Sequence, residues 1–210
     1  MQDIIHLDVF VVTALIFVMT PGIDTIFVLN KAISEGKTIG VYSTLGINVG
    51  VMVHTFLAAM GLSIIITQSA IAFQLIKYCG AAYLFYLGIS SLVNKKELNI
   101  DLGKGKEQKS NKEHFFNGVV TNVLNPKVAL FFLSFFPQFI KEEAIGNALP
   151  FLILGSVYAF IGVVWFLIIT YFSTLFSRKL RSNKKFNTYL NKCSGIVFLM
   201  MGIKVLFKNK

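Results

Sequence analysis

Charged residues are scarce in this chain of 210 residues, where they make up 14% of the composition against 55% hydrophobic residues. The mean hydropathy is +0.68. So little charge cannot cover the surface of a water-soluble domain, and the balance is typical of an integral membrane protein. Apolar runs of bilayer-spanning length predict an all-α protein with six transmembrane helices. These runs lie at about 4–30, 39–67, 71–93, 115–140, 149–176 and 189–207.

Several catalytic and metal-binding motifs are missing as well. The sequence contains no phosphate-binding loop, which argues against transport driven by ATP, and no nucleophile beside a base, which argues against an intramembrane enzyme. The two cysteines, Cys79 and Cys193, form no CxxC pair, and we expect both to pack within apolar helices. We therefore predict no metal site, no cofactor and no enzymatic activity. Transport of metal or other ions by a protein with six such helices stays an alternative function, which the small number of intramembrane ligand residues disfavours.

Positive charge exceeds negative charge, with 20 Lys and Arg residues against 10 Asp and Glu residues. The basic residues gather in the first, third and fifth connectors, at 31–37, 95–112 and 178–185. Because basic connectors stay in the cytoplasm, both termini are expected on the outside, although the basic tail at 204–210 argues weakly for the opposite. The charge thus reports orientation in a lipid bilayer, and nucleic acid is not an expected partner.

The first apolar run contains a helix break next to a lone carboxylate. Thr20, Pro21 and Gly22 interrupt the run, and Asp24 follows them. Proline and glycine leave backbone groups unpaired, which the membrane interior tolerates only where the backbone lines a cavity or packs against protein. A charge at that depth is costly and usually functional. We predict that this segment lines a functional site within the membrane and that Asp24 faces an ammonium group or a proton.

A matching break, from Asn122 to Lys127, interrupts the fourth run, and Asn125, Pro126 and Lys127 are its candidate site residues. A half-helix that begins at Pro126 would turn its free N–H groups and its positive dipole end towards a substrate carboxylate. Lys127 either lies on the same path or extends to the cytoplasmic interface.

The two breaks suggest an internal duplication, because 105 residues separate Pro21 from Pro126. The chain divides into a three-helix repeat at 1–93, a charged cytoplasmic linker at 94–113 and a second three-helix repeat at 114–210. Since each repeat crosses the membrane three times, the two copies must be inverted relative to each other. In transporters of this kind, the substrate and ion site lies near the midplane between the broken helices.

Other polar and small residues within the spans are candidates for the path or for packing. Asn48 either lines the path or ties helices together, and His54 is a candidate proton relay for which a helix–helix hydrogen bond is the alternative. Glycines at GxxxG spacing, or at matching positions of the two repeats, are expected to permit close helix contact. These glycines are Gly46, Gly50, Gly88 and Gly202.

Three motifs carry a resemblance to a known family. They are Thr20-Pro21-Gly22-x-Asp24, Gly46-Ile47-Asn48-Val49-Gly50 and Asn125-Pro126-Lys127. With the six-span length they make the whole chain resemble the LysE/RhtB amino-acid exporters. Ile23 departs from the family pattern, where a second proline is common, and this should soften the first break.

The resemblance implies a secondary active exporter in the cytoplasmic membrane of a bacterium. Its substrates would be amino acids or their derivatives, such as homoserine, threonine or lysine, and protons would be the coupling ion. The sequence does not select among these substrates, and it leaves a homo-oligomeric assembly open.

Overall fold

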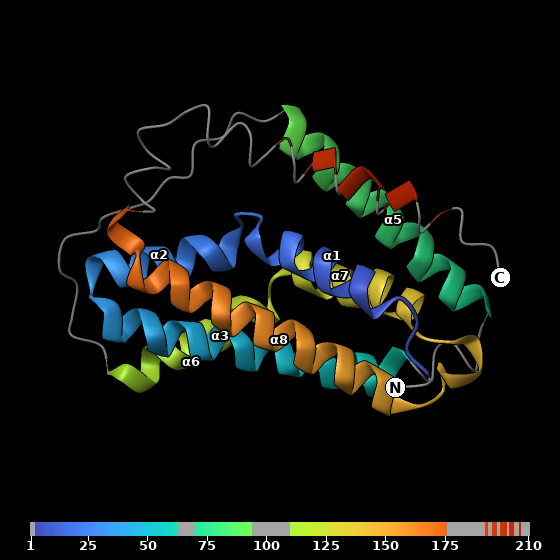
Figure 1. The fold of residues 1–210 in the computed structure, drawn as a ribbon, viewed down its shortest axis with the longest axis horizontal. Coiled ribbons are helices and arrows are strands. Elements are labelled where there is room, and N and C mark those ends of the chain that lie inside the picture. Colours follow the sequence, from blue (N-terminus) through green and yellow to red (C-terminus); the bar gives the residue numbers. More distant parts are fainter. Residues whose placement is uncertain are drawn as a thin grey trace.

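The regular elements of the computed structural model are helices, within the part of the chain that it describes. That part comprises residues 3–62, 70–93 and 110–175, together with residues 192, 195–196, 198–200, 202–203 and 206. The α-helices are α1 (Leu7–Met19), α2 (Ile23–Ser34), α3 (Lys37–Leu57), α5 (Ala70–Val93), α6 (Asn111–Val123), α7 (Pro126–Phe135) and α8 (Ala148–Tyr171) (Figure 1). The shorter elements are η1 (Ala58–Leu62), η2 (Phe136–Phe139) and η3 (Glu142–Ala144).

Both sequence-predicted breaks are present. The α1–α2 pair bends by 54° and the α6–α7 pair bends by 51°, each at a break of no more than four residues. Pro21 falls between α1 and α2, whereas Pro126 is the first residue of α7. Proline suits a first helical turn because the N–H that it lacks would have no partner there.

Four membrane spans are the most that the described residues provide. α3, continued to Gly61, and α8 are each long and apolar enough to cross a bilayer, and each bent pair can count as one further span. The third predicted run is helical as α5, which contains a shorter apolar stretch at Tyr78–Val93. The sixth predicted run, at 189–207, lies largely outside the described residues.

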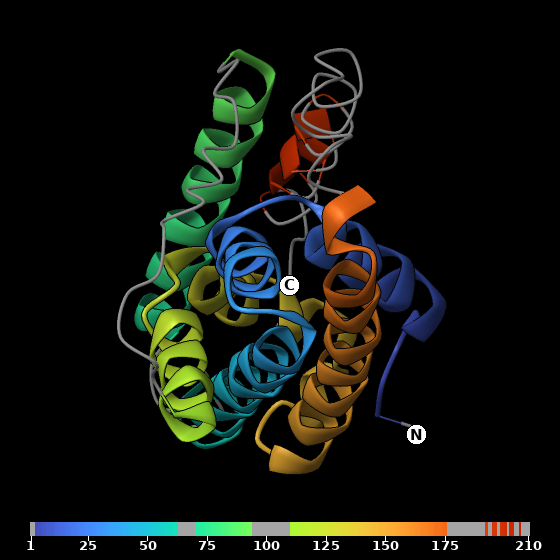
Figure 2. The same cartoon turned by 90° about the vertical axis from the view of Figure 1, so that its left-hand side faces the viewer.

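α3 packs against the other helices of an elongated bundle. It contacts α2, α6 and α8, while α1 packs on α8 and α5 packs on α7 (Figure 1). α5 lies to one side of this bundle, next to the helical residues of the sixth run (Figure 2). The 24-residue α8 is about 36 Å long at 1.5 Å per residue, which is enough to cross a hydrocarbon core.

The predicted packing glycines lie at close helix contacts. A Cβ atom at Gly46 would come within 2.0 Å of the Phe115 backbone oxygen, and one at Gly50 within 2.7 Å of Asn122 Cβ. These positions let α3 approach α6. Gly88 of α5 meets Leu199 and Gly195 of the sixth run, and Gly202 meets Phe85 of α5.

Aromatic rings fill the half of the bundle that holds α1, α7 and η2. Phe131 contacts Phe17 with 4.1 Å between ring centroids, and Phe132 stacks on Phe136 at the same separation. Phe10 of α1 adds edge contacts to Phe136 and Phe139. These rings are almost completely buried, so this half of the bundle is closed by tightly packed side chains.

The outer surface is apolar, as a lipid-facing surface must be. Large hydrophobic side chains such as Val12, Phe160 and Ile168 are exposed on α1 and α8. Cys79 is exposed as well, so the expectation that this thiol packs inside apolar helices is wrong. The expectation for Cys193 lies outside the described residues.

Candidate functional site

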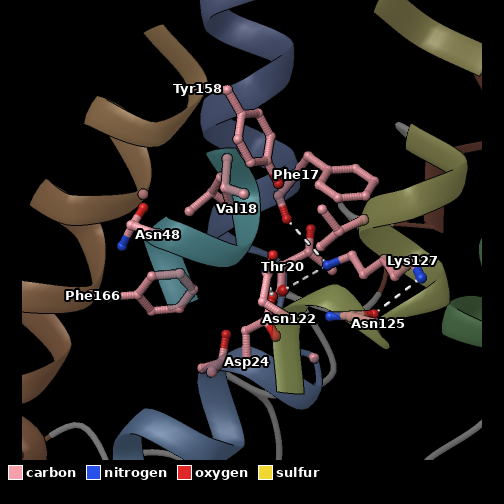
Figure 3. A pocket seen from close by; sticks show the side chains of 15 residues that line it. Phe17, Val18, Thr20, Asp24, Asn48, Asn122, Asn125, Lys127, Tyr158 and Phe166 are labelled. Carbon is pink, nitrogen blue, oxygen red and sulfur yellow. Dashed lines mark hydrogen bonds between the residues drawn. The ribbon is translucent and has the colours of Figure 1, made fainter. Parts of the chain in front are cut away.

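A small cavity lies where the two broken helices meet α3 and α8. Both breaks contribute to its wall, and α3 and α8 contribute residues from the middle of their lengths, Asn48 and Gly162 among them. The cavity is therefore near the mid-depth of the bundle. Its polar lining residues are Thr20, Asp24, Thr25, Asn48, Asn122, Asn125, Lys127 and Tyr158, and Phe17, Val51 and Phe166 are among its apolar ones (Figure 3).

Asp24 provides the carboxylate of this cavity. It lies in the first turn of α2, where the N-terminal end of the helix dipole favours a negative charge. Its exposed fraction is 9%, and Asn122 Nδ2 donates a hydrogen bond of 2.9 Å to its Oδ2 atom. Asn125 lies beside the same carboxylate. The charge is thus taken out of bulk water and held by amides from the opposite broken helix.

Lys127 provides the cation, and it bonds to the first break. Its ammonium group donates to the backbone oxygens of Phe17 and Thr20, at 3.1 Å and 3.0 Å (Figure 3). It also lies 4.5 Å from the centre of the Phe17 ring, within the range of a cation–π contact. α1 ends at Met19, so its last carbonyls have no partner within the helix. Lys127 therefore caps α1 from the other half of the chain.

The N-terminus of α7 is already capped in this structure. Asn125 Oδ1 accepts a hydrogen bond of 3.0 Å from the Lys127 N–H, and the Asn125 backbone oxygen accepts one of 3.1 Å from Val128 N. The N–H groups that we expected to face a substrate carboxylate are therefore bonded within the protein. The N-terminus of α2 differs, because its N-cap is Gly22 and no side chain caps it.

The two other polar candidates have different surroundings. Asn48 lines the cavity, with its Nδ2 atom donating to Thr44 O at 2.8 Å. His54 lies outside the cavity lining, and its Nε2 atom is 3.1 Å from the Asn122 backbone oxygen. That contact joins α3 to α6, as in the alternative that we gave for His54.

Several residues of the cavity wall, Asn122, Tyr158 and Phe166 among them, were not among the candidate site residues. Asn122 is the most buried polar residue of the wall, and it is the first residue of the second break that the sequence predicts. Tyr158 and Phe166 line the cavity because the orientation of α8 about its own axis turns these two side chains inward. Nothing in an apolar run like that of α8 distinguishes these aromatic residues from lipid-facing ones.

The free volume of the cavity is about 20 Å³. That is enough for about one water molecule and too little for an amino acid. The wall combines one carboxylate, one ammonium group and several amides with aromatic rings. Such a site can recognise a zwitterion at both charged ends, provided that the bundle opens to admit it.

A family model, LysE type translocator, matches residues 15–209 of the chain. The chain belongs to the LysE type translocator family. The match covers both breaks and every residue of the cavity lining, so the site described above is part of the translocator fold itself.

Membrane proteins of bacteria, and a leucine efflux protein, resemble this chain along most of its length. An uncharacterized membrane protein of Bacillus subtilis (strain 168), YrhP, is 35% identical over 91% of this chain and 93% of its own. A leucine efflux protein of Enterobacter sp. (strain 638) is 31% identical over 90% of both chains. An uncharacterized membrane protein of Vibrio cholerae is 29% identical over 92% of this chain and 93% of its own. No solved structure matches the translocator.

Proposed function

We propose that this translocator exports amino acids from a bacterial cytoplasm, as a secondary active transporter coupled to proton entry. The observation that carries the proposal is the cavity itself, where Asp24 and Lys127 bring opposite charges to one small space near mid-depth. A zwitterionic amino acid needs one group for each of its charges. The leucine efflux protein, 31% identical to this chain, supports amino acids as the substrate class.

In this proposal the two halves of the chain form inverted repeats. The similar bends of 54° and 51° support it, and so do the helix contacts. α3 packs on α6, the first half of the second broken helix, and its counterpart α8 packs on α1, the first half of the first. Rocking of one repeat against the other around a fixed site would give alternating access.

Each charged group has a separate task in the transport cycle that we propose. Asp24 binds the ammonium end of the substrate and takes up a proton when the substrate leaves. Lys127 binds the carboxylate end, for which its ammonium group must release the carbonyls of Phe17 and Thr20. Because each charged end of the zwitterion is paired with an opposite charge of the protein, the free-energy cost of holding the zwitterion away from water is lower.

Proton coupling then follows from the competition for one carboxylate. A substrate ammonium and a proton cannot both neutralise Asp24, so the two occupy it in alternation. Export is favourable when the proton enters down its gradient as the amino acid leaves. In the orientation that we propose, both termini lie outside the inner membrane and the linker at 94–113 is cytoplasmic.

The test is efflux from proteoliposomes preloaded with single amino acids, across a panel that includes leucine, threonine, lysine and homoserine. We expect efflux of at least one of them to accelerate when the external medium is acidified and to slow when a protonophore removes the gradient. If no amino acid leaves faster than from protein-free liposomes, the export proposal is wrong. If efflux ignores the gradient, only the coupling is wrong.

A further inference from the structure

Three buried oxygen atoms of the cavity residues accept no hydrogen bond of ordinary geometry from the described residues, although Asn125 lies beside the Asp24 carboxylate. They are Oδ1 of Asp24, Oδ1 of Asn48 and Oδ1 of Asn122. The exposed fractions of these side chains are 9%, 6% and 0%. Buried acceptors are normally satisfied, so three of them around one cavity call for a donor that the protein does not supply.

The surroundings hold two of these oxygens in place. The Nδ2 atom of Asn122 donates to Asp24, and the Nδ2 atom of Asn48 donates to Thr44. These hydrogen bonds fix the orientation of each amide and so the position of its oxygen. Gly162 leaves room for the Asn48 oxygen, because a Cβ atom there would come within 2.5 Å of it. Gly50 does the same for Asn122, whose oxygen would be 2.8 Å from a Cβ atom. The acceptors are therefore fixed by packing before any ligand arrives.

We propose that these three oxygens bind the primary ammonium group of the substrate. An ammonium group donates three hydrogen bonds, and the carboxylate of Asp24 supplies the opposite charge. The closed cavity, with a free volume of about 20 Å³, has room for a group the size of an ammonium group. The proposal rests on the export of amino acids proposed above, and it adds the selection of substrates with an unmodified amino group.

The first test compares ligands with altered ends. L-leucine and L-threonine, whose only ammonium group is the α-amino group, are each added with their N-acetyl derivative and their methyl ester, as inhibitors of amino-acid exchange in proteoliposomes. The methyl ester keeps the ammonium group, whereas the N-acetyl derivative loses the positive charge of that group and two of its three donors. We expect the N-acetyl derivative to inhibit at least about a hundredfold more weakly than the free amino acid. Equal inhibition by the two would overturn the proposal.

The second test removes single acceptors. Asn48→Ala and Asn122→Ala should each raise the half-inhibiting concentration of the free amino acid and of its methyl ester by about ten- to a hundredfold, and by the same factor for both ligands. The matched control is Asn117→Ala, which lies on α6 like Asn122 but outside the cavity lining and should leave both values unchanged. Should Asn122→Ala fail to fold, Asn48→Ala alone decides.

Three outcomes separate this proposal from its competitors. If wild-type exchange requires sodium and the two Asn variants change only that requirement, the oxygens bind a sodium ion and the ammonium proposal is wrong. If amino acids are exchanged but the Asn variants respond like Asn117→Ala, export stands and this assignment fails. If the free amino acids are not exchanged at all, the failure belongs to the export proposal.

Discussion

The two broken helices bend to nearly the same extent, but the helix ends at the two breaks are capped in different ways. At the first break no side chain caps α2, and the last carbonyls of α1 are bound by Lys127 of the other half. At the second break Asn125 caps α7 from within the same segment. The first break therefore depends on the second, whereas the second is locally complete. The two breaks thus share a similar bend but differ at the start of the following helix. The N-terminus of α2, which holds Asp24, has no side-chain cap, whereas the N-terminus of α7, which holds Lys127, is capped.

The largest effect is expected from Asp24→Asn, which removes the charge of the first break. The amide keeps the shape of the side chain but can no longer exchange a proton. Gradient-driven efflux should be lost, while exchange of amino acids in the absence of a gradient persists at a reduced rate. Efflux and exchange in proteoliposomes measure the two separately, with Asp24→Glu retaining part of the driven efflux. Gradient-driven efflux at the wild-type rate would move the coupling group elsewhere, with His54 the next residue to test.

Lys127→Met removes the cation that joins the two breaks. The apolar side chain fills similar space but leaves the carbonyls of Phe17 and Thr20 without their donor, at a cost of about 1–3 kcal/mol for each carbonyl that stays buried. We expect both a lower melting temperature and at least a tenfold weaker half-saturation by amino acids. Thermal unfolding and concentration-dependent efflux test the two expectations, and Lys141→Met, on the connector after η2, is the control. A variant that matches the control in both measurements would exclude a capping role.

Asn125→Ala removes the cap that makes the second break locally complete. Loss of an N-cap costs about 1 kcal/mol, which lowers the melting temperature of a protein of this size by about 2–4 °C. Asn147 offers a matched control, because its side chain also accepts at 3.0 Å from a backbone N–H two residues on, at the start of α8 and outside the cavity lining. Asn147→Ala should cost similar stability and leave efflux intact, whereas Asn125→Ala should also slow efflux. Identical efflux in the two variants would mean that α7 needs no cap to transport.

The smallest effect is expected where α8 faces the breaks. Gly162→Ala places a Cβ atom against the Asn48 oxygen and forces that side chain to move, which should slow efflux several-fold with little loss of stability. Gly61→Ala is the control, since a Cβ atom there meets nothing within 4 Å. Comparison of their initial efflux rates at equal expression decides, and equal rates would show that the Asn48 position is not critical.

The sequence was sufficient to predict the breaks because their cause is local. Pro21, Gly22 and Pro126 impose their effect on the backbone whatever surrounds them. Asp24 and Lys127 could be singled out because charges are rare within apolar runs. Only the pairing of the two breaks predicted that these residues converge on one cavity, and residues of both breaks do line the cavity.

The remaining features depend on helix rotation and on contacts between distant segments. Tyr158 reaches the cavity only because α8 turns that face inward, and its apolar run carries no periodic signal of which face this is. The free end of α7 was expected from the position of Pro126, but the side chain of Asn125 folds back on it. The pairing of His114 with Glu35, 2.9 Å apart, joins α6 to the end of α2 and has no counterpart in any sequence motif.

The cap that Lys127 places on α1 has a consequence for the concentrations at which an exporter works. If Lys127 receives the substrate carboxylate, each arriving amino acid must displace two backbone carbonyls that already satisfy the ammonium group. The free energy of binding then includes only the difference between the hydrogen bonds that Lys127 makes to the substrate and those that it makes to the carbonyls of Phe17 and Thr20. When the substrate leaves, these carbonyls bind Lys127 again. Such a transporter holds its cargo weakly and stays idle at ordinary metabolite levels. It would export amino acids only once their cytoplasmic concentration is high.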